Sequence, residues 1–301
     1  MTQPATHLGS PPSESVSRWL TRSSWVLALG LAANSILGPF VLDVIEYRYS
    51  ESLVNQGIGL DAVALFAAAP LAIVAALLVA RRHPAGPVVA FGPALFAAYM
   101  APQYVVGPEY LTLPGNNERF FVFHLTIFVV AVATAVLAWR AIDPAALAPD
   151  NEQSDRRRSL VLFGVVAFIF GGRWLVGIVD LLGGEPTGVD YRENPTAYLL
   201  IGFLDLGVVV PAAVAAAVGL RRHRPWARTA AYAVIGWFAL VPAAVAAMAI
   251  VMQVNDDPDA TTGATVMFVV AAVVFTAAAA QLYRPVFGTV AGERDERPVH
   301  R

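Results

Sequence analysis

Residues 60–80 read LDAVALFAAAPLAIVAALLVA, and Arg81, Arg82 and His83 follow directly. As a helix, this stretch is long enough to cross the ~30 Å hydrocarbon core of a bilayer, which takes about 20 residues. The rest of the chain repeats this pattern of a long apolar run that ends at a short polar segment. The further runs cover roughly residues 23–44, 86–106, 121–141, 159–182, 196–220, 227–250 and 263–283. The sequence therefore predicts an all-α membrane bundle with eight transmembrane helices.

The composition favours membrane helices over other classes. Of the 301 residues, 57% are hydrophobic and 14% are charged, whereas a soluble domain carries about 25% charged residues. The runs are continuous, while strands of a membrane barrel are about 10 residues long and alternate in polarity. A helix also satisfies its own backbone polar groups, as a bilayer requires. The first run resembles a signal peptide but exceeds an h-region of about 7–15 residues, so we expect an uncleaved span.

The distribution of arginine predicts the orientation, because short arginine-rich loops stay on the cytoplasmic side. Sixteen arginines fall in the two tails and in alternate loops: Arg18, Arg22, Arg81, Arg82, Arg140, Arg156, Arg157, Arg158, Arg221, Arg222, Arg224, Arg228, Arg284, Arg294, Arg297 and Arg301. Arg48, Arg119 and Arg192 fall in the other loops, and Arg173 completes the 20. We therefore expect a multi-pass plasma-membrane protein with both termini in the cytoplasm. Acidic residues gather in the outer loops, which suits either a cation-attracting surface or simple solubility.

The two halves of the sequence resemble each other. Each half has a proline, an alanine-rich run and a basic turn in the same order: Pro70 with Arg81-Arg82-His83, and Pro211 with Arg221-Arg222-His223. Pro102 and Pro242 occupy corresponding places further along. Because each half holds an even number of spans, both halves would enter the membrane in the same sense, as a parallel repeat.

This interpretation divides the chain into five parts. They are a disordered cytoplasmic tail (1–22), a first four-helix repeat (23–141), a cytoplasmic linker (142–158), a second four-helix repeat (159–285) and a second cytoplasmic tail (286–301). Pro70 and Pro211 are expected to make matched kinks in the two repeats, since proline is tolerated in membrane helices when neighbours satisfy the freed carbonyl.

Among the residues of the predicted spans, Arg173 costs the most free energy to insert into the bilayer. An arginine at mid-span costs about 2.5–3.5 kcal/mol on insertion scales, so it should face protein or water. We place it roughly 12–15 Å below the outer surface from the helical rise. Asp205 lies at a similar depth on the next span, so we expect an Arg173–Asp205 ion pair. The pair suits a substrate or proton-relay site, or a structural lock within a helix hairpin.

Asp180 and His124 complete the set of candidate intramembrane polar residues. Asp180 shares a helix face with Arg173 and Gly177 by spacing. His124 lies about one turn inside the outer end of the fourth run, where it suits an interfacial side chain or a pH-sensitive group. The first half offers no Arg–Asp pair in its first two spans, only Asn34 at a matching depth, so we expect any site to be asymmetric.

Several kinds of chemistry are not expected. The chain has no cysteine, which excludes disulfides and thiolate metal sites. We find no metal-ligand spacing, nucleophile elbow or phosphate loop. We therefore expect a protein that is not an enzyme and that has no cofactor or metal, with the lipid bilayer and other membrane subunits as partners and no nucleic acid.

One segment resembles a known group of sequences. It comprises Asn194-Pro195, Asp205-Leu206-Gly207, Pro211 and Arg224-Pro225-Trp226. This pattern resembles a segment of an uncharacterised family of bacterial polytopic membrane proteins, in which a helix with Asp-Leu-Gly and a later proline leads into a basic Pro-Trp turn. The resemblance implies a membrane-helical fold and no particular activity.

The sequence leaves three functional hypotheses open. The first is a small-solute or ion-coupled permease, or a subunit of one, and it predicts a cavity that reaches Arg173 and Asp205. The second is a non-catalytic structural or assembly partner of a membrane complex, which predicts a closed interior. The third is a membrane enzyme acting on lipid, which would need polar residues clustered at one interface, and the sequence has no such cluster.

Overall fold

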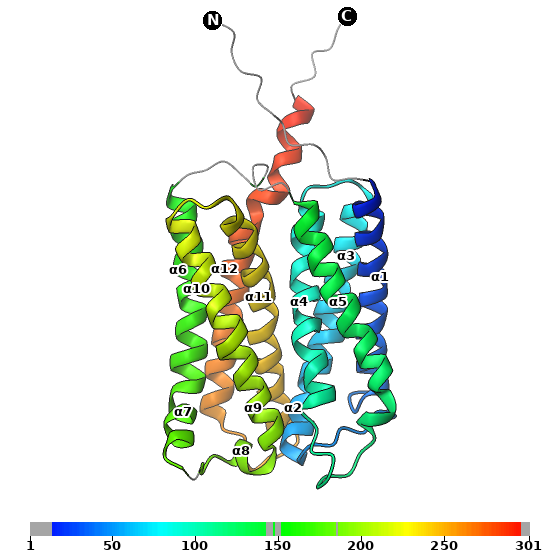
Figure 1. Ribbon diagram of the computed structural model, residues 1–301, viewed down its shortest axis with the longest axis vertical. Helices are drawn as coiled ribbons and strands as arrows, with labels where there is room; N and C mark the ends of the chain where they lie inside the picture. Colours follow the sequence, from blue (N-terminus) through cyan, green and yellow to red (C-terminus); the bar gives the residue numbers. More distant parts are fainter. Residues whose placement is uncertain (1–13, 143–146, 148–151, 185, 296–301) are drawn as a thin grey trace, which may run out of the picture.

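The computed structural model describes residues 14–142, 147, 152–184 and 186–295, and the chain forms long helices that run side by side (Figure 1). Parts of the predicted tails and most of the predicted linker lie outside the described residues. Among the described residues, the predicted domain boundaries at 22 and 158 fall inside helices, because one helix begins at Glu14 and another at Glu152.

The first half holds α1 (Glu14–Leu37), a continuous helix made of α2 (Glu51–Val63), η1 (Ala64–Ala68) and α3 (Ala69–Ala80), then α4 (Ala85–Val106), the short η2 (Asn117–Phe120) and α5 (Phe121–Ala141). The second half holds a continuous helix made of α6 (Glu152–Val166), η3 (Ala167–Trp174) and α7 (Leu175–Leu182), the short α8 (Val189–Glu193), a continuous helix made of α9 (Pro195–Leu204), η4 (Asp205–Val209) and α10 (Val210–Arg221), then α11 (Pro225–Val254) and α12 (Thr262–Asp295).

Seven helices in the described part are long and apolar enough to cross a membrane, and they match seven of the predicted runs. The helix α1 is not among them. The prediction that the first span extends to residue 44 is wrong, because the helix ends at Leu37, before Gly38 and Pro39. Proline lacks the N–H that a continuing helix needs. The helix begins earlier than predicted, at Glu14, so it includes polar residues such as Arg18 and Arg22.

The second span also differs from its prediction. It begins at Glu51 rather than at residue 60, and Ser50 caps it by accepting a hydrogen bond from the Leu53 backbone N–H. The polar residues between them, with the sequence ESLVNQGIG, obscured the start of this helix. Asp61 consequently lies well inside the helix, not at its outer end, and is fully buried.

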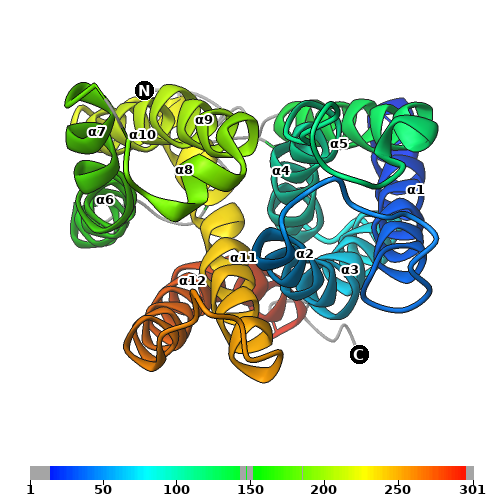
Figure 2. The same cartoon turned by 90° about the horizontal axis from the view of Figure 1, so that it is seen from below.

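The helices form two groups (Figures 1 and 2). In the first group, residues 14–141, α1 packs on α3 and α5, and α4 packs on both of these. In the second group, residues 152–295, α10 packs on α6 and α11, and α11 packs on α12. The groups meet where α11 packs on α2 and α4, and where α9 approaches α4. The two central helices α4 and α11 are accordingly the most buried, at 72% and 56% of their apolar windows.

Glycine allows the two groups to approach closely. A Cβ atom added to Gly59 on α2 would overlap the Met248 backbone nitrogen on α11. A Cβ added to Gly92 on α4 would lie 3.1 Å from the Gly236 carbonyl oxygen. Small residues at such crossings allow the backbone contact that drives helix association in lipid.

Three long helices contain a π-helical segment: η1, η3 and η4. Two of these segments end two residues before a proline, at Ala68 before Pro70 and at Val209 before Pro211. Proline removes an N–H and crowds the carbonyl four residues earlier, so a locally wider helix relieves the clash. π-Segments inside α-helices are frequent at functional sites.

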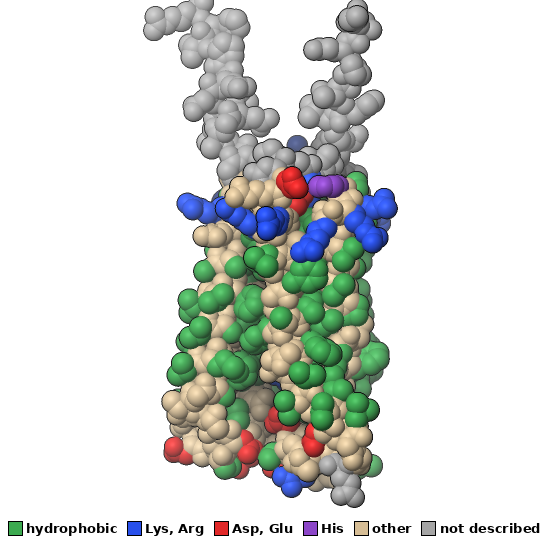
Figure 3. All heavy atoms as spheres, turned by 90° about the vertical axis from the view of Figure 1, so that its left-hand side faces the viewer, with side chains coloured by type: hydrophobic (Ala, Val, Ile, Leu, Met, Phe, Trp, Pro, Cys, Tyr) green, Lys and Arg blue, Asp and Glu red, His purple; other side chains and the backbone are tan. Residues whose placement is uncertain are grey.

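The charged side chains divide between the two ends of the bundle. On the face shown in Figure 3, arginines lie along the end where α1 begins, and acidic side chains are concentrated at the opposite end. We call these the arginine-rich end and the acidic end. The side wall between them is mainly apolar in this view, as a lipid-facing surface would be.

We expect Gly59→Ala to loosen the contact between the groups. The added methyl would overlap the Met248 backbone, and overpacking of this kind costs about 1–3 kcal/mol. Thermal unfolding of the detergent-solubilised protein measures the loss. The matched control is Gly263→Ala on α12, where no atom lies within 4 Å of the added Cβ. Equal stability of the two variants would contradict the close crossing.

Candidate functional site

A cavity lies between the two helix groups. Its volume is about 90 Å³, enough for a few waters or a small organic solute, because a water occupies about 30 Å³ in the liquid. The wall is formed by α2, α4, η3, α9, η4, α11 and α12. Its polar members are Tyr49, Gln56, Tyr99, Gln103, Tyr104, Arg173 and Asp205. The remainder is apolar and aromatic, including Phe96, Phe168, Trp237, Phe238 and Phe268.

Asp205, the first residue of η4, is the acid of this cavity. Its side chain is 6% exposed. Trp174 Nε1 donates to Oδ2 at 2.7 Å, and the Tyr99 hydroxyl donates to Oδ1 at 2.8 Å. Because Tyr99 belongs to α4 and Trp174 to η3, this carboxylate connects the two helix groups. The sequence analysis did not identify either neutral donor.

Arg173 lies beside Asp205 as the sequence suggested, but the contact is long. The distance from Arg173 Nε to Asp205 Oδ2 is 3.8 Å, and the arginine side chain is 39% exposed. Its guanidinium also lies 5.6 Å from the centre of the Trp174 ring. A guanidinium carries five N–H donors, and in the described part of the chain none of them makes a short hydrogen bond to protein. Arg173 therefore presents donors to whatever enters beside it.

Asp180 does not belong to this site. Its carboxylate accepts hydrogen bonds from the Thr187 and Gly188 backbone N–H groups at 2.7 and 3.2 Å. The Thr187 hydroxyl donates to the other oxygen at 3.1 Å. Asp180 thus fixes the loop that follows α7, and it is absent from the cavity wall.

A second buried carboxyl group lies in the first helix group. Asp61 Oδ1 accepts from Asn34 Nδ2 at 3.0 Å and from the Tyr104 hydroxyl at 2.9 Å. Asp61 Oδ2 accepts from the Tyr47 hydroxyl at 2.7 Å. All four side chains are almost completely buried. No arginine in the described residues forms an ion pair with Asp61.

His124 belongs to this second cluster and not to the cavity. Its Nε2 lies 2.9 Å from Asn34 Oδ1, and its ring stacks on Tyr104 with centroids 5.1 Å apart. The side chain is 0% exposed, so the predicted interfacial position is wrong. We call Asn34, Tyr47, Asp61, Tyr104 and His124 the Asp61 cluster. The first half, in which only Asn34 was expected at a matching depth, thus also buries an acid, Asp61.

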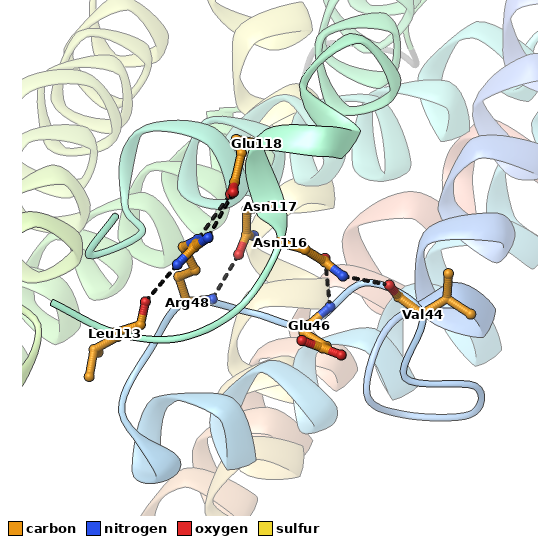
Figure 4. Close-up of polar contacts among 7 residues, drawn as sticks. All are labelled: Val44, Glu46, Arg48, Leu113, Asn116, Asn117 and Glu118. Atoms are coloured by element: carbon orange, nitrogen blue, oxygen red, sulfur yellow. Dashed lines mark hydrogen bonds and ion pairs between the residues drawn. The ribbon is translucent and has the colours of Figure 1, made fainter. Parts of the chain in front are cut away.

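At the acidic end, the loop after α1 is bonded to the segment that leads into α5 (Figure 4). The Arg48 backbone N–H donates to Asn117 Oδ1 at 2.7 Å, and the Glu46 backbone N–H donates to Asn116 Oδ1 at 3.0 Å. Arg48 also makes a two-pronged ion pair with Glu118, at 2.7 and 2.9 Å. The Glu118 carboxylate raises the pKa of the Arg48 guanidinium above its usual value. Tyr47, between Glu46 and Arg48, is held over Asp61 as a result.

Hydrogen bonds also join the two helix groups near the acidic end. Asn194 and Ser50 exchange two hydrogen bonds, at 2.9 and 2.7 Å. Asn55 on α2 donates to Asp257 Oδ2 at 2.9 Å. The Asn194-Pro195 pair that suggested a family resemblance thus has a visible structural role in this chain.

A third polar cluster lies near the arginine-rich end. Asp155 Oδ1 bonds Arg158 Nη1 at 2.9 Å, and its Oδ2 bonds Arg228 Nη2 at 3.0 Å. Arg158 Nη2 donates to the Tyr232 hydroxyl at 2.9 Å. Its opposite charges are paired and it joins α6 to α11, so we regard it as structural. The described residues contain no group of three His, Asp or Glu side chains that could hold a metal ion.

Sequence reasoning found Arg173, Asp205 and His124 as polar residues in apolar runs, but it missed how they are grouped. The signal for Asp61 was its place inside LDAVALFAAAP, where an acid has no lysine or arginine within helical reach. Tyr47, Tyr99 and Tyr104 gave no comparable signal, because a tyrosine near a membrane interface is common.

No family model matches the chain, and no curated protein or solved structure matches it either. The functional argument therefore rests on the geometry of the two buried carboxyl clusters.

We expect neutral donors, rather than Arg173, to hold Asp205. In double-mutant cycles of unfolding free energy, Arg173→Gln with Asp205→Asn should give a coupling below about 1 kcal/mol, because the pair is long and partly exposed. Trp174→Phe with Asp205→Asn should give a larger coupling, about 1.5–3 kcal/mol, as for hydrogen bonds to a charged group. The opposite order would show that the ion pair is a structural lock.

Proposed function

We propose that this protein is a permease for small organic anions, with its binding site in the cavity between the helix groups. The observation that carries the proposal is Arg173, a partly exposed guanidinium with open donors in a cavity of about 90 Å³. An intramembrane ionisable residue is a functional candidate by default. The apolar wall suits the carbon skeleton of a solute with only a few heavy atoms.

The charge balance at Arg173 supports an anionic ligand. Asp205 has its two short hydrogen bonds from Trp174 and Tyr99, so its charge is stabilised without full use of the guanidinium. A planar guanidinium binds a carboxylate through two parallel hydrogen bonds. Asp205 lies 3.8 Å from Arg173 Nε and neutralises the positive charge of the guanidinium only in part. A solute carboxylate beside Arg173 would neutralise the rest.

We further propose eight crossings, with α1 as the eighth, in two parallel four-helix repeats. The packing of α1 between α3 and α5 supports the added crossing. The π-segments before Pro70 and Pro211 support the repeat, as do the left-handed residues Arg82 and His223 in the two corresponding turns, with φ of 56° and 52°. In parallel-repeat transporters the site lies between the halves, which is the location of this cavity.

The orientation is proposed from the charge distribution. We place the arginine-rich end in the cytoplasm and the acidic end outside, in the plasma membrane, because basic loops are retained on the cytoplasmic side. The cavity then lies nearer the outer surface, since Tyr49 and Leu53 in its wall belong to the acidic end.

The second candidate is an assembly partner of a membrane complex. It is favoured by α12, whose apolar window is only 6% buried. Val266, Val270, Val273 and Val274 form an exposed stripe on it, which either lipid or another subunit would cover. This candidate requires no ligand in the cavity.

We expect propionate to bind the purified protein and stabilise it against thermal unfolding. At ten times its Kd, binding to the folded state alone adds about 1.4 kcal/mol. Propionamide, which has nearly the same shape but no charge, should have little effect. Arg173→Gln should abolish the propionate effect, while Arg119→Gln in the outer region should keep it. Equal stabilisation by propionate and propionamide would contradict the anion site. If propionate binds, its uptake into proteoliposomes distinguishes permeation from binding.

Single-cysteine labelling tests the crossings on a natural cysteine-free background. In intact cells, we expect Leu42→Cys and Thr112→Cys to react with a membrane-impermeant maleimide. Arg18→Cys and Gln153→Cys should react only after permeabilisation. Labelling of Arg18→Cys and Leu42→Cys from the same side would show that α1 does not cross.

A further inference from the structure

We propose that Asp61 is a proton-binding site, reached from the cavity through the hydroxyl group of Tyr104. That this proton accompanies solute movement rests on the proposed permease function. The existence of the proton site does not.

The two buried carboxyl groups differ in their charge partners. Asp205 has Arg173 at 3.8 Å. Asp61 has no cationic partner in the described residues, and its side chain is completely buried. An isolated buried carboxylate is costly and is relieved when the group becomes neutral. Of the two acids, Asp61 is therefore the one whose protonation removes an uncompensated charge.

The surroundings of Asp61 favour a proton over a metal cation. Asn34 Nδ2 and the two tyrosine hydroxyls all direct donors at the carboxylate oxygens. A cation site needs converging oxygen lone pairs instead. A proton needs a single oxygen, and it can be accommodated by rotation of one tyrosine hydroxyl, which then accepts rather than donates.

His124 positions the cluster through Asn34. The amide nitrogen of Asn34 donates to Asp61, so its Oδ1 must accept, and His124 Nε2 at 2.9 Å is the donor. The network thus places a proton on His124 Nε2. Because His124 fixes the amide direction, it keeps one donor on Asp61 in either protonation state. We regard it as a positioning residue.

Tyr104 connects the cluster to the cavity. Its side chain lines the cavity, and its hydroxyl bonds Asp61 Oδ1 at 2.9 Å. A hydronium ion in the cavity gives a proton to the Tyr104 oxygen and becomes water. Tyr104 passes its own hydroxyl proton to Asp61 Oδ1, which becomes a neutral carboxylic acid. The net change is one proton moved from cavity water to Asp61.

Few other groups can titrate with Asp61. The titratable side chains that face it are Tyr47 from the loop after α1, Tyr104 from α4 and His124 from α5. Neighbouring charges are already bound: Arg48 pairs with Glu118, and Asp257, beside α11, accepts from Asn55. Asp61 is thus the one carboxyl group in this cluster.

Infrared difference spectroscopy of the purified full-length protein tests the proposal without any solute. On acidification from about pH 8 to pH 5, we expect a carboxylic-acid C=O band to appear in the wild type. Asp61→Asn should lose this band, while Asp205→Asn, the matched control, should keep it. In Tyr104→Phe the carboxylate loses a donor, so the acid form should persist to higher pH, and its exchange with deuterium from heavy water should slow.

Each result decides the proposal. A band that survives Asp61→Asn, or that disappears in Asp205→Asn alone, would overturn it. If Asp61→Asn does not fold, Tyr104→Phe decides instead, since an unshifted band with unchanged deuterium exchange would exclude both the assignment and the route. Because no propionate is present, failure of the anion site leaves this test unaffected.

Discussion

The interior of a bilayer offers no hydrogen bonds, so each acid placed within it must find its partners in the protein. This constraint organises the molecule. Asp205 and Asp61 are both buried, and in both cases aromatic side chains supply short hydrogen bonds from other helices. Trp174 and Tyr99 tie the second helix group to α4, while Tyr47 and Tyr104 tie the loop after α1 to α2 and α4. Contacts between the groups thus depend on Asp205, and contacts within the first group depend on Asp61.

The two clusters differ in the charge partner of the buried acid, and this difference bears on function. One acid has an arginine with open donors and borders a cavity. The other has no cation and lies behind a single tyrosine from the same cavity. We propose that this arrangement places an anion site at Arg173 and a proton site at Asp61 on two sides of one cavity.

Much of the fold could be predicted from the sequence. Long apolar runs between basic turns locate seven helices, because hydrocarbon thickness fixes their length. The ends were harder. Polar residues that cap and link the second span obscured its start at Glu51. Gly38-Pro39 ended α1 before the predicted residue 44. Pro70 and Pro211 predicted distorted helices next to η1 and η4, whereas no proline predicts η3.

The site was predictable only in part. Arg173 and Asp205 stand out as charges in apolar runs, and their near contact follows from depth in adjacent helices. The donors Tyr99 and Tyr104 could not be assigned, because their partners are distant in the chain and depend on how the two groups pack. His124 was identified as a candidate, but its partner Asn34 lies 90 residues away in the chain, on α1.

The most direct test of the central claim is the affinity for propionate as a function of pH, in the wild type and in Asp61→Asn. Proton and anion binding must influence each other reciprocally if the sites are coupled. Protonation of Asp61 removes a negative charge near the cavity, so wild-type affinity should increase at least about fivefold between pH 8 and pH 6, within the usual range of coupling. Asp61→Asn should bind tightly at both values. The same pH dependence in both proteins would contradict the account.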